Sequence, residues 1–209
     1  MKNLVCLTFL LCGSLPVCKA QSPDRKFQLG PQAGWGWSKI QTKEFTYSGG
    51  ISAGLSGSVP IGGKFYLQPE VNFQQMGGKR KEQVRMGTNE YRKWKLRLTS
   101  IYTPVLLKYN LKTSGFSLLC GPQVGINLQR KSILEGYPAE KVKRWEGLDF
   151  AGVIGMEYRI PVSKTGLSVF TSPRYSFGLR DFRLKPYQMP GEEKGFRQSY
   201  FALLAGVRF

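Results

Sequence analysis

The sequence contains no histidine and little cysteine, and both shortages exclude chemistry. Three of its four cysteines, Cys6, Cys12 and Cys18, lie in the N-terminal segment considered below, which leaves Cys120. Histidine-based triads and histidine metal sites therefore cannot form, and one cysteine can build neither a zinc cluster nor an intramolecular disulfide. A serine nucleophile motif is missing too. We expect no enzymatic activity, no metal and no cofactor.

Acidic residues are also few. The chain has 13 Asp and Glu against 31 Lys and Arg, a formal net charge of +18. Such a basic balance raises nucleic acid as a partner. Here, however, the positive residues concentrate between the strands predicted below, and the N-terminus resembles an export signal. We therefore expect no nucleic acid partner, and anionic lipid headgroups outside the cell as the first contact of this charge.

A long hydrophobic run is missing as well. The apolar stretch at 4–11 is far shorter than the roughly 20 residues of a spanning helix. Lys2 before it and the small residue Ala20 after it are typical of a signal peptide cleaved after Ala20. The alternative is a lipoprotein acylated on Cys18, although Val17 is larger than the residue usual before a lipidated cysteine. Cleavage leaves a mature domain of 21–209 with a formal charge of +16, because Lys2 and Lys19 are removed from +18.

After Gln21 the recurring pattern is the alternation of apolar with small or polar residues, not helical periodicity. The clearest segment, 116–129, alternates Phe116, Leu118 and Cys120 with Ser117, Leu119 and Gly121. The pattern predicts eight strands, at 27–38, 48–59, 65–75, 94–109, 116–129, 148–160, 167–180 and 199–209. A slip of phase near 99–101 predicts a β-bulge in the fourth.

The predicted connections alternate in length. Three are short and glycine-containing, at 61–63, 112–115 and 163–166, and four are long, at about 39–47, 77–93, 130–147 and 181–198. Outer-membrane barrels show this asymmetry, with the short side periplasmic and the apolar face toward lipid. The sequence therefore predicts an all-β fold, an eight-stranded antiparallel up-and-down transmembrane barrel. A soluble secreted barrel or sandwich, with its apolar face inward, is the alternative.

Several segments resemble a known family. They are 102–109 (YTPVLLKY), 121–125 (GPQVG), 149–155 (DFAGVIG), 174–179 (RYSFGL) and 204–209 (LAGVRF). They look like the PorT-like outer-membrane β-barrel domain of Bacteroidetes, and the resemblance covers essentially the whole mature chain. It implies a location in the bacterial outer membrane and, from the member that names the family, a link to protein secretion.

Charged residues on the predicted inward face are the main candidate site. They are Glu70, Lys108, Asp149, Glu157, Arg159, Arg174, Arg180 and Arg208. Side chains fill the interior of an eight-stranded barrel, and charges buried there must pair. We expect them to close the lumen with salt bridges; the alternative is a gate or a narrow ion path.

Two further sites follow from the pattern. The second long loop is basic, and we expect it to contact lipopolysaccharide phosphates through Lys79, Arg80, Lys81, Arg85, Arg92 and Lys93. Phe209 resembles the terminal aromatic residue by which such barrels engage the barrel-assembly machinery during insertion.

These features predict a structural or accessory protein of the cell envelope, with an envelope or secretion protein as a partner. A narrow channel or binding barrel for a small solute is the alternative, and a lipid-modifying enzyme is the weaker one.

Overall fold

The computed structural model describes residues 27–40, 46–83, 91–111, 115–134, 140–141, 147–162, 166–179 and 197–209. The predicted signal peptide, 1–20, lies outside these residues. None of the described residues forms a helix long and apolar enough to cross a membrane.

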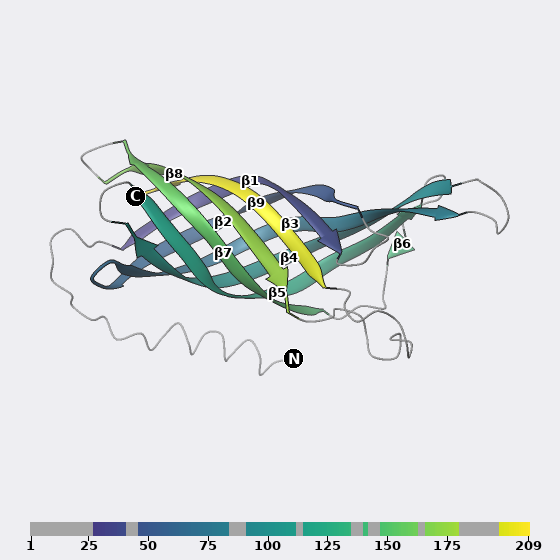
Figure 1. The fold of residues 1–209 in the computed structure, drawn as a ribbon, viewed down its shortest axis with the longest axis horizontal. Helices are drawn as coiled ribbons and strands as arrows, with labels where there is room; N and C mark the ends of the chain where they lie inside the picture. Colours follow the sequence, from purple (N-terminus) through teal and green to yellow (C-terminus); the bar gives the residue numbers. More distant parts are fainter. Residues whose placement is uncertain are drawn as a thin grey trace.

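The described chain is a closed antiparallel barrel (Figure 1). Its strands are β1 (Gln28–Ile40), β2 (Ser48–Gly62), β3 (Phe65–Gln83), β4 (Tyr91–Asn110), β5 (Phe116–Leu134), β6 (Glu140–Lys141), β7 (Leu148–Pro161), β8 (Ser168–Gly178) and β9 (Gln198–Arg208). Each long strand pairs with its neighbours along the chain, and β1 pairs with β9, while the two-residue β6 only adds to the end of β5. Eight strands therefore form the wall, which confirms the predicted fold.

The barrel closes between its first and last strands, where the backbones lie very close together. Leu29 and Phe209 exchange two backbone hydrogen bonds of 3.1 Å. A Cβ atom added to Gly30 would lie 1.7 Å from the carbonyl oxygen of Val207, and one on Gly34 would lie 2.0 Å from that of Leu203. The closing seam therefore requires glycine at these positions of β1.

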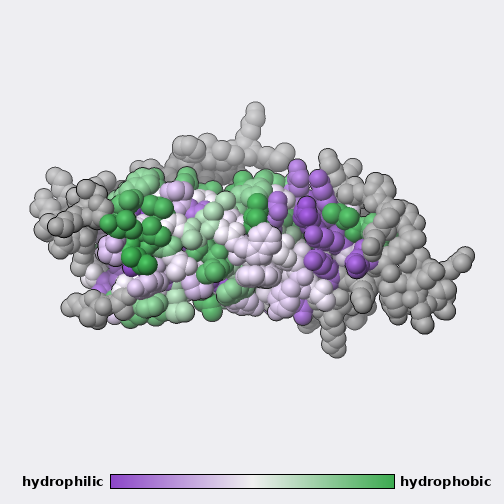
Figure 2. All heavy atoms as spheres, turned by 90° about the horizontal axis from the view of Figure 1, so that it is seen from above, coloured by the Kyte–Doolittle hydropathy of each residue, from purple (hydrophilic) through white to green (hydrophobic). Residues whose placement is uncertain are grey.

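The two faces of the wall have the polarity predicted for a membrane barrel. Along β5, Phe116, Leu118 and Ile126 are exposed on the outside, whereas Ser117 and Gln123 are buried. Hydrophobic side chains cover much of the surface seen in Figure 2. The alternative of a soluble barrel with an apolar interior is therefore wrong, because exposed large apolar side chains cover the outside, whereas the lumen holds many polar and charged ones.

Local geometry follows the predicted turns and bulge. Gly63, Gly115 and Gly166 have positive φ values of 54°, 70° and 100° in the three short connections, a conformation that glycine adopts at no steric cost. The register of β4 against β5 shifts between Thr99 and Ser100, within the predicted bulge. Arg180, predicted to end the seventh strand, lies outside the described residues, and β8 ends at Gly178.

The second and third long loops are shorter than predicted. β3 and β4 continue as a paired extension, residues 77–83 with 91–97 (Figure 1), and β5 runs to Leu134. The extension forms because the alternation persists: Leu96 and Leu98 are fully or nearly buried on the inward face, while Lys95 and Arg97 lie on the outward one. A sequence rich in lysine and arginine favours the prediction of a loop. Outside the hydrocarbon layer, however, these residues are equally compatible with the solvent-facing side of a strand.

Candidate functional site: the charged lumen

The inward faces of five strands bring charged side chains together in the lumen. Glu70 on β3, Lys108 on β4, Glu157 on β7, Arg174 on β8 and Arg208 on β9 are each at most 5% exposed. They point inward because each has the strand phase that puts its apolar neighbours on the wall. The salt bridges below divide them into two halves, one around Glu157 and one around Glu70.

Glu157 is the centre of the first half of this group. Its Oε1 accepts hydrogen bonds from Lys108 Nζ at 2.5 Å and from Arg208 Nη1 at 2.8 Å, and its Oε2 accepts one from Arg208 Nη2 at 2.7 Å. The arginine therefore forms a bidentate pair, the geometry that favours Arg over Lys at a carboxylate. The guanidinium of Arg208 also lies 4.4 Å from the ring centroid of Phe170, a cation–π contact.

Glu70 is the centre of the second half. Its Oε2 accepts hydrogen bonds from Arg174 Nη1 at 2.6 Å and from Gln32 Nε2 and Asn72 Nδ2 at 2.8 Å each. Its Oε1 accepts one from Gln68 Nε2 at 2.6 Å. One carboxylate thus receives four donors from β1, β3 and β8, which satisfies its capacity for hydrogen bonds.

We call these eight residues the lumen network: Gln32, Gln68, Glu70, Asn72, Lys108, Glu157, Arg174 and Arg208. Its half around Glu70 connects β1, β3 and β8, and its half around Glu157 connects β4, β7 and β9. Buried ion pairs contribute little net stability, but loss of one partner leaves an uncompensated charge. Two carboxylates face three cations in the network, so each carboxylate is indispensable to the balance.

Two predicted members lie apart from the network. Asp149 accepts a hydrogen bond of 2.6 Å from the Tyr102 hydroxyl, and Tyr102 packs with Met76, Tyr200, Ala202 and Leu204 in an apolar cluster of the lumen. Arg159 is half-buried and donates to Gln28 Oε1 at 2.8 Å. The predicted cluster of eight is therefore divided, since residues that share the inward face can lie at different heights along the barrel.

Sequence reasoning missed the neutral partners of the carboxylates. Gln32, Gln68 and Asn72 carry no charge, yet they make three of the four hydrogen bonds to Glu70. Their signal in the sequence is an amide side chain at an inward-facing position of a strand.

The arrangement of the site is that of a filled interior. The carboxylates contact cations and amide donors, and these contacts fill space and fix the strands that carry them. Among the described residues, no group of three or more His, Cys, Asp or Glu side chains could hold a metal ion.

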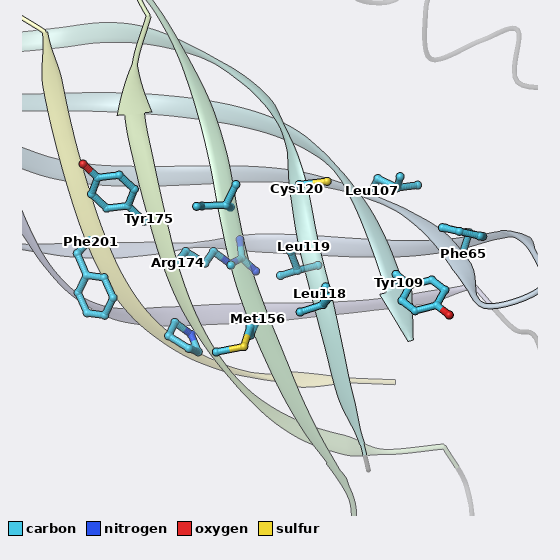
Figure 3. A pocket seen from close by; sticks show the side chains of 13 residues that line it. Phe65, Leu107, Tyr109, Leu118, Leu119, Cys120, Met156, Arg174, Tyr175 and Phe201 are labelled. Atoms are coloured by element: carbon cyan, nitrogen blue, oxygen red, sulfur yellow. The ribbon is translucent and has the colours of Figure 1, made fainter. Parts of the chain in front are cut away.

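The outer wall has an apolar depression across β3 to β9. Its lining includes Phe65, Leu118, Cys120, Met156 and Phe201, and Figure 3 shows them spread over several neighbouring strands. Arg174 also lines it, although its side chain is only 5% exposed. Cys120 is exposed among these apolar groups. The depression therefore lies mainly among the apolar side chains of the outward face.

A family comparison agrees with this architecture. The sequence profile of the outer membrane protein beta-barrel domain family matches residues 19–183. The chain belongs to this family. Its fold class and its place among outer-membrane barrels of bacteria follow directly, and the outward apolar face of this outer-membrane barrel is the face that meets lipid.

Solved outer-membrane barrels are similar in shape at low sequence identity. Neisserial surface protein A is 14% identical with a TM-score of 0.49, and the match covers 87% of this chain and 95% of that one. Ail, the attachment invasion locus protein of Yersinia pestis, solved with the heparin analogue sucrose octasulfate, is 13% identical with a TM-score of 0.47; the match covers 88% of this chain and 99% of Ail. No curated protein matches the sequence.

The basic residues predicted for the second loop belong mostly to strands, which corrects that prediction. Lys79, Arg80 and Lys81 lie in β3, and Arg92 and Lys93 lie in β4, while Arg85 lies outside the described residues. The prediction also omitted Lys95 and Arg97, which were assigned to the membrane strand.

Phe209, the predicted recognition residue for the assembly machinery, is 66% exposed at the end of the seam.

Proposed function

We propose that this outer-membrane barrel has a closed lumen and a structural or accessory role in the cell envelope, without catalysis or solute transport. The lumen network carries the proposal. The ion pair of Arg174 with Glu70 joins strands on opposite sides of the interior, and those of Glu157 join strands that have one strand between them. The cluster around Tyr102 and Tyr200 fills another part of the lumen. An eight-stranded barrel has room for side chains or for one small ligand, and here side chains occupy that room.

We further propose that the short turns face the periplasm and the β3–β4 extension faces outward from the cell. The asymmetry of the connections supports this orientation. A protease added to intact cells is expected to cut within the extension end and to leave the turn at Gly63 untouched. Cleavage at the turn alone would contradict the orientation.

The conductance of the purified protein tests the closed lumen. In a planar lipid bilayer we expect no discrete current steps above background, because the charged side chains of the network are buried and almost inaccessible to water. A large-pore porin reconstituted in the same way provides the positive control. Reproducible steps that disappear on heat denaturation would contradict the proposal and favour the narrow channel.

The accessory role is the finer part of the proposal. The similarity of segments 102–109 and 121–125 to PorT-like proteins of Bacteroidetes supports a partner from the secretion apparatus, and an exposed Phe209 supports recognition by the assembly machinery. A photo-crosslinking residue at Lys131, which is exposed on the outward face of β5 toward the extension end, is expected to capture an envelope protein in intact cells. The same residue at Lys64, by a short turn, is the matched control.

A further inference from the structure

The outward face of β3, β4 and β5 changes its chemistry in successive rows toward the extension. The register places one residue of each strand in a row, and each row is about 7 Å further along the strands. The rows are apolar (Phe73, Ile101, Ile126), then uncharged polar (Gln75, Thr99, Gln129), then cationic (Gly77, Arg97, Lys131) and again cationic (Lys79, Lys95, Ile133).

The cations of the last two rows are direct cross-strand neighbours. Lys79 pairs with Lys95, and Arg97 pairs with Lys131. Like charges in such positions destabilise a sheet. Within the described part of the chain, no carboxylate forms an ion pair with these four residues. The pairing therefore concentrates positive charge whose repulsion an external anion would relieve.

The environment of Lys95 shows the same crowding. Lys79, Arg97 and Lys131 are exposed, whereas Lys95 is half-buried between them. Partial burial, followed by the charges of Arg97 and Lys79, lowers the pKa of Lys95 from its ordinary value. A bound anion would act in the opposite direction.

The height of the rows indicates which anion fits. They begin one polar row beyond the apolar row of Phe73, Ile101 and Ile126, at a height that fits the change from the hydrocarbon layer to charged headgroups. The face seen in Figure 2 likewise has strongly hydrophilic side chains toward the end that carries the extension. A ligand with phosphates directly above acyl chains would place each part against a matching row of β3–β5.

We propose that Lys79, Lys95, Arg97 and Lys131, here called the cationic face, bind the phosphate groups of lipopolysaccharide in the outer leaflet. Lysine and arginine make charge-assisted hydrogen bonds to phosphate oxygens. The inference rests on the proposed function only in the outward orientation of the extension. The binding surface is then a strand surface instead of the predicted loop, and the register of the strands sets the spacing of its cations.

Binding of lipopolysaccharide to the refolded full chain in detergent tests the proposal. We compare the natural chain with the triple variant Lys95→Gln, Arg97→Gln, Lys131→Gln. The matched control, Lys39→Gln, Lys64→Gln, Arg197→Gln, removes the same number of positive charges from other parts of the wall. Each protein is titrated with lipopolysaccharide and with the same preparation after enzymatic dephosphorylation, and heat-modified migration on gels verifies folding.

The triple variant is expected to bind phosphorylated lipopolysaccharide at least roughly tenfold more weakly than the natural chain, and the control variant within about twofold of it. Dephosphorylated lipopolysaccharide should bind all three proteins equally. Equal affinity of the natural chain and the folded triple variant for phosphorylated lipopolysaccharide would overturn the proposal. A triple variant that loses binding to a soluble sulfated glycan but still binds lipopolysaccharide as the natural chain does would also overturn it. Because the assay measures neither conductance nor orientation, its outcome is independent of those two tests.

Discussion

Replacing Glu157 with glutamine is expected to lower the free energy of unfolding by about 3–5 kcal/mol, because the change leaves two buried cations without their carboxylate. Lys108 and Arg208 both depend on Glu157, and all three side chains are at most 2% exposed. Urea unfolding of the refolded protein, followed by the fluorescence of its four tryptophans, measures the loss.

Lys108→Met provides the matched control, since it removes a charge from the same network without leaving one unpaired. The bidentate pair of Glu157 with Arg208 stays intact, and we expect a loss below about 1.5 kcal/mol. The double variant Glu157→Gln, Lys108→Met should recover part of the stability of Glu157→Gln, because one of the two unpaired cations is gone. Equal losses in the two single variants would show that charge balance does not hold the network together.

Gly30→Ala is expected to prevent closure of the barrel or to destabilise it by about 3 kcal/mol or more. The new Cβ would meet the backbone carbonyl of Val207 at 1.7 Å, at the seam between β1 and β9. A backbone atom in a hydrogen-bonded ladder cannot rotate away as a side chain can, so one strand must shift. The fraction of protein that folds, read from heat-modified migration on gels, measures the effect.

Gly57→Ala tests whether the effect belongs to the seam or to loss of glycine in general. Gly57 pairs with Leu29, next to Gly30 in sequence. A Cβ there would meet ring carbons of Phe27 and a carbon of Pro69 at ordinary distances of 3.4–3.7 Å. We expect a change within about 0.5 kcal/mol. Similar folding of the Gly30 and Gly57 variants would exclude a tight seam.

The extension shows where sequence reasoning went wrong. The predicted fourth strand began at Trp94, and the charged residues before it suggested a loop. Strand pairing was nevertheless favoured because Leu96 and Leu98 are buried on one side, which only the closed barrel provides. The alternation was present in the sequence. Within the membrane the outward residues are apolar, whereas in the extension the outward residues are charged and the inward ones apolar. A rule that requires apolar outward residues everywhere therefore ends the strands too early.

The lumen shows a different limit. Inward phase identified Glu70, Glu157, Arg174 and Arg208 from sequence, because alternation has a period of two and each residue has a definite face. It could not pair Glu70 with Arg174, 104 residues away, since the partner depends on the stagger of strands around the barrel. The amides at Gln32, Gln68 and Asn72 carried no charge to draw attention.

The sequence alone thus determined the barrel, the number of its wall strands, the face of each residue and the turns at Gly63, Gly115 and Gly166. These properties are local, because alternation and positive φ depend on neighbouring residues. Tertiary structure alone decided the ion pairs of Glu157, the split of Asp149 and Arg159 from the network, and the rows that bring Lys79 beside Lys95 and Arg97 beside Lys131. These depend on register between strands, which is set by closure of the whole barrel.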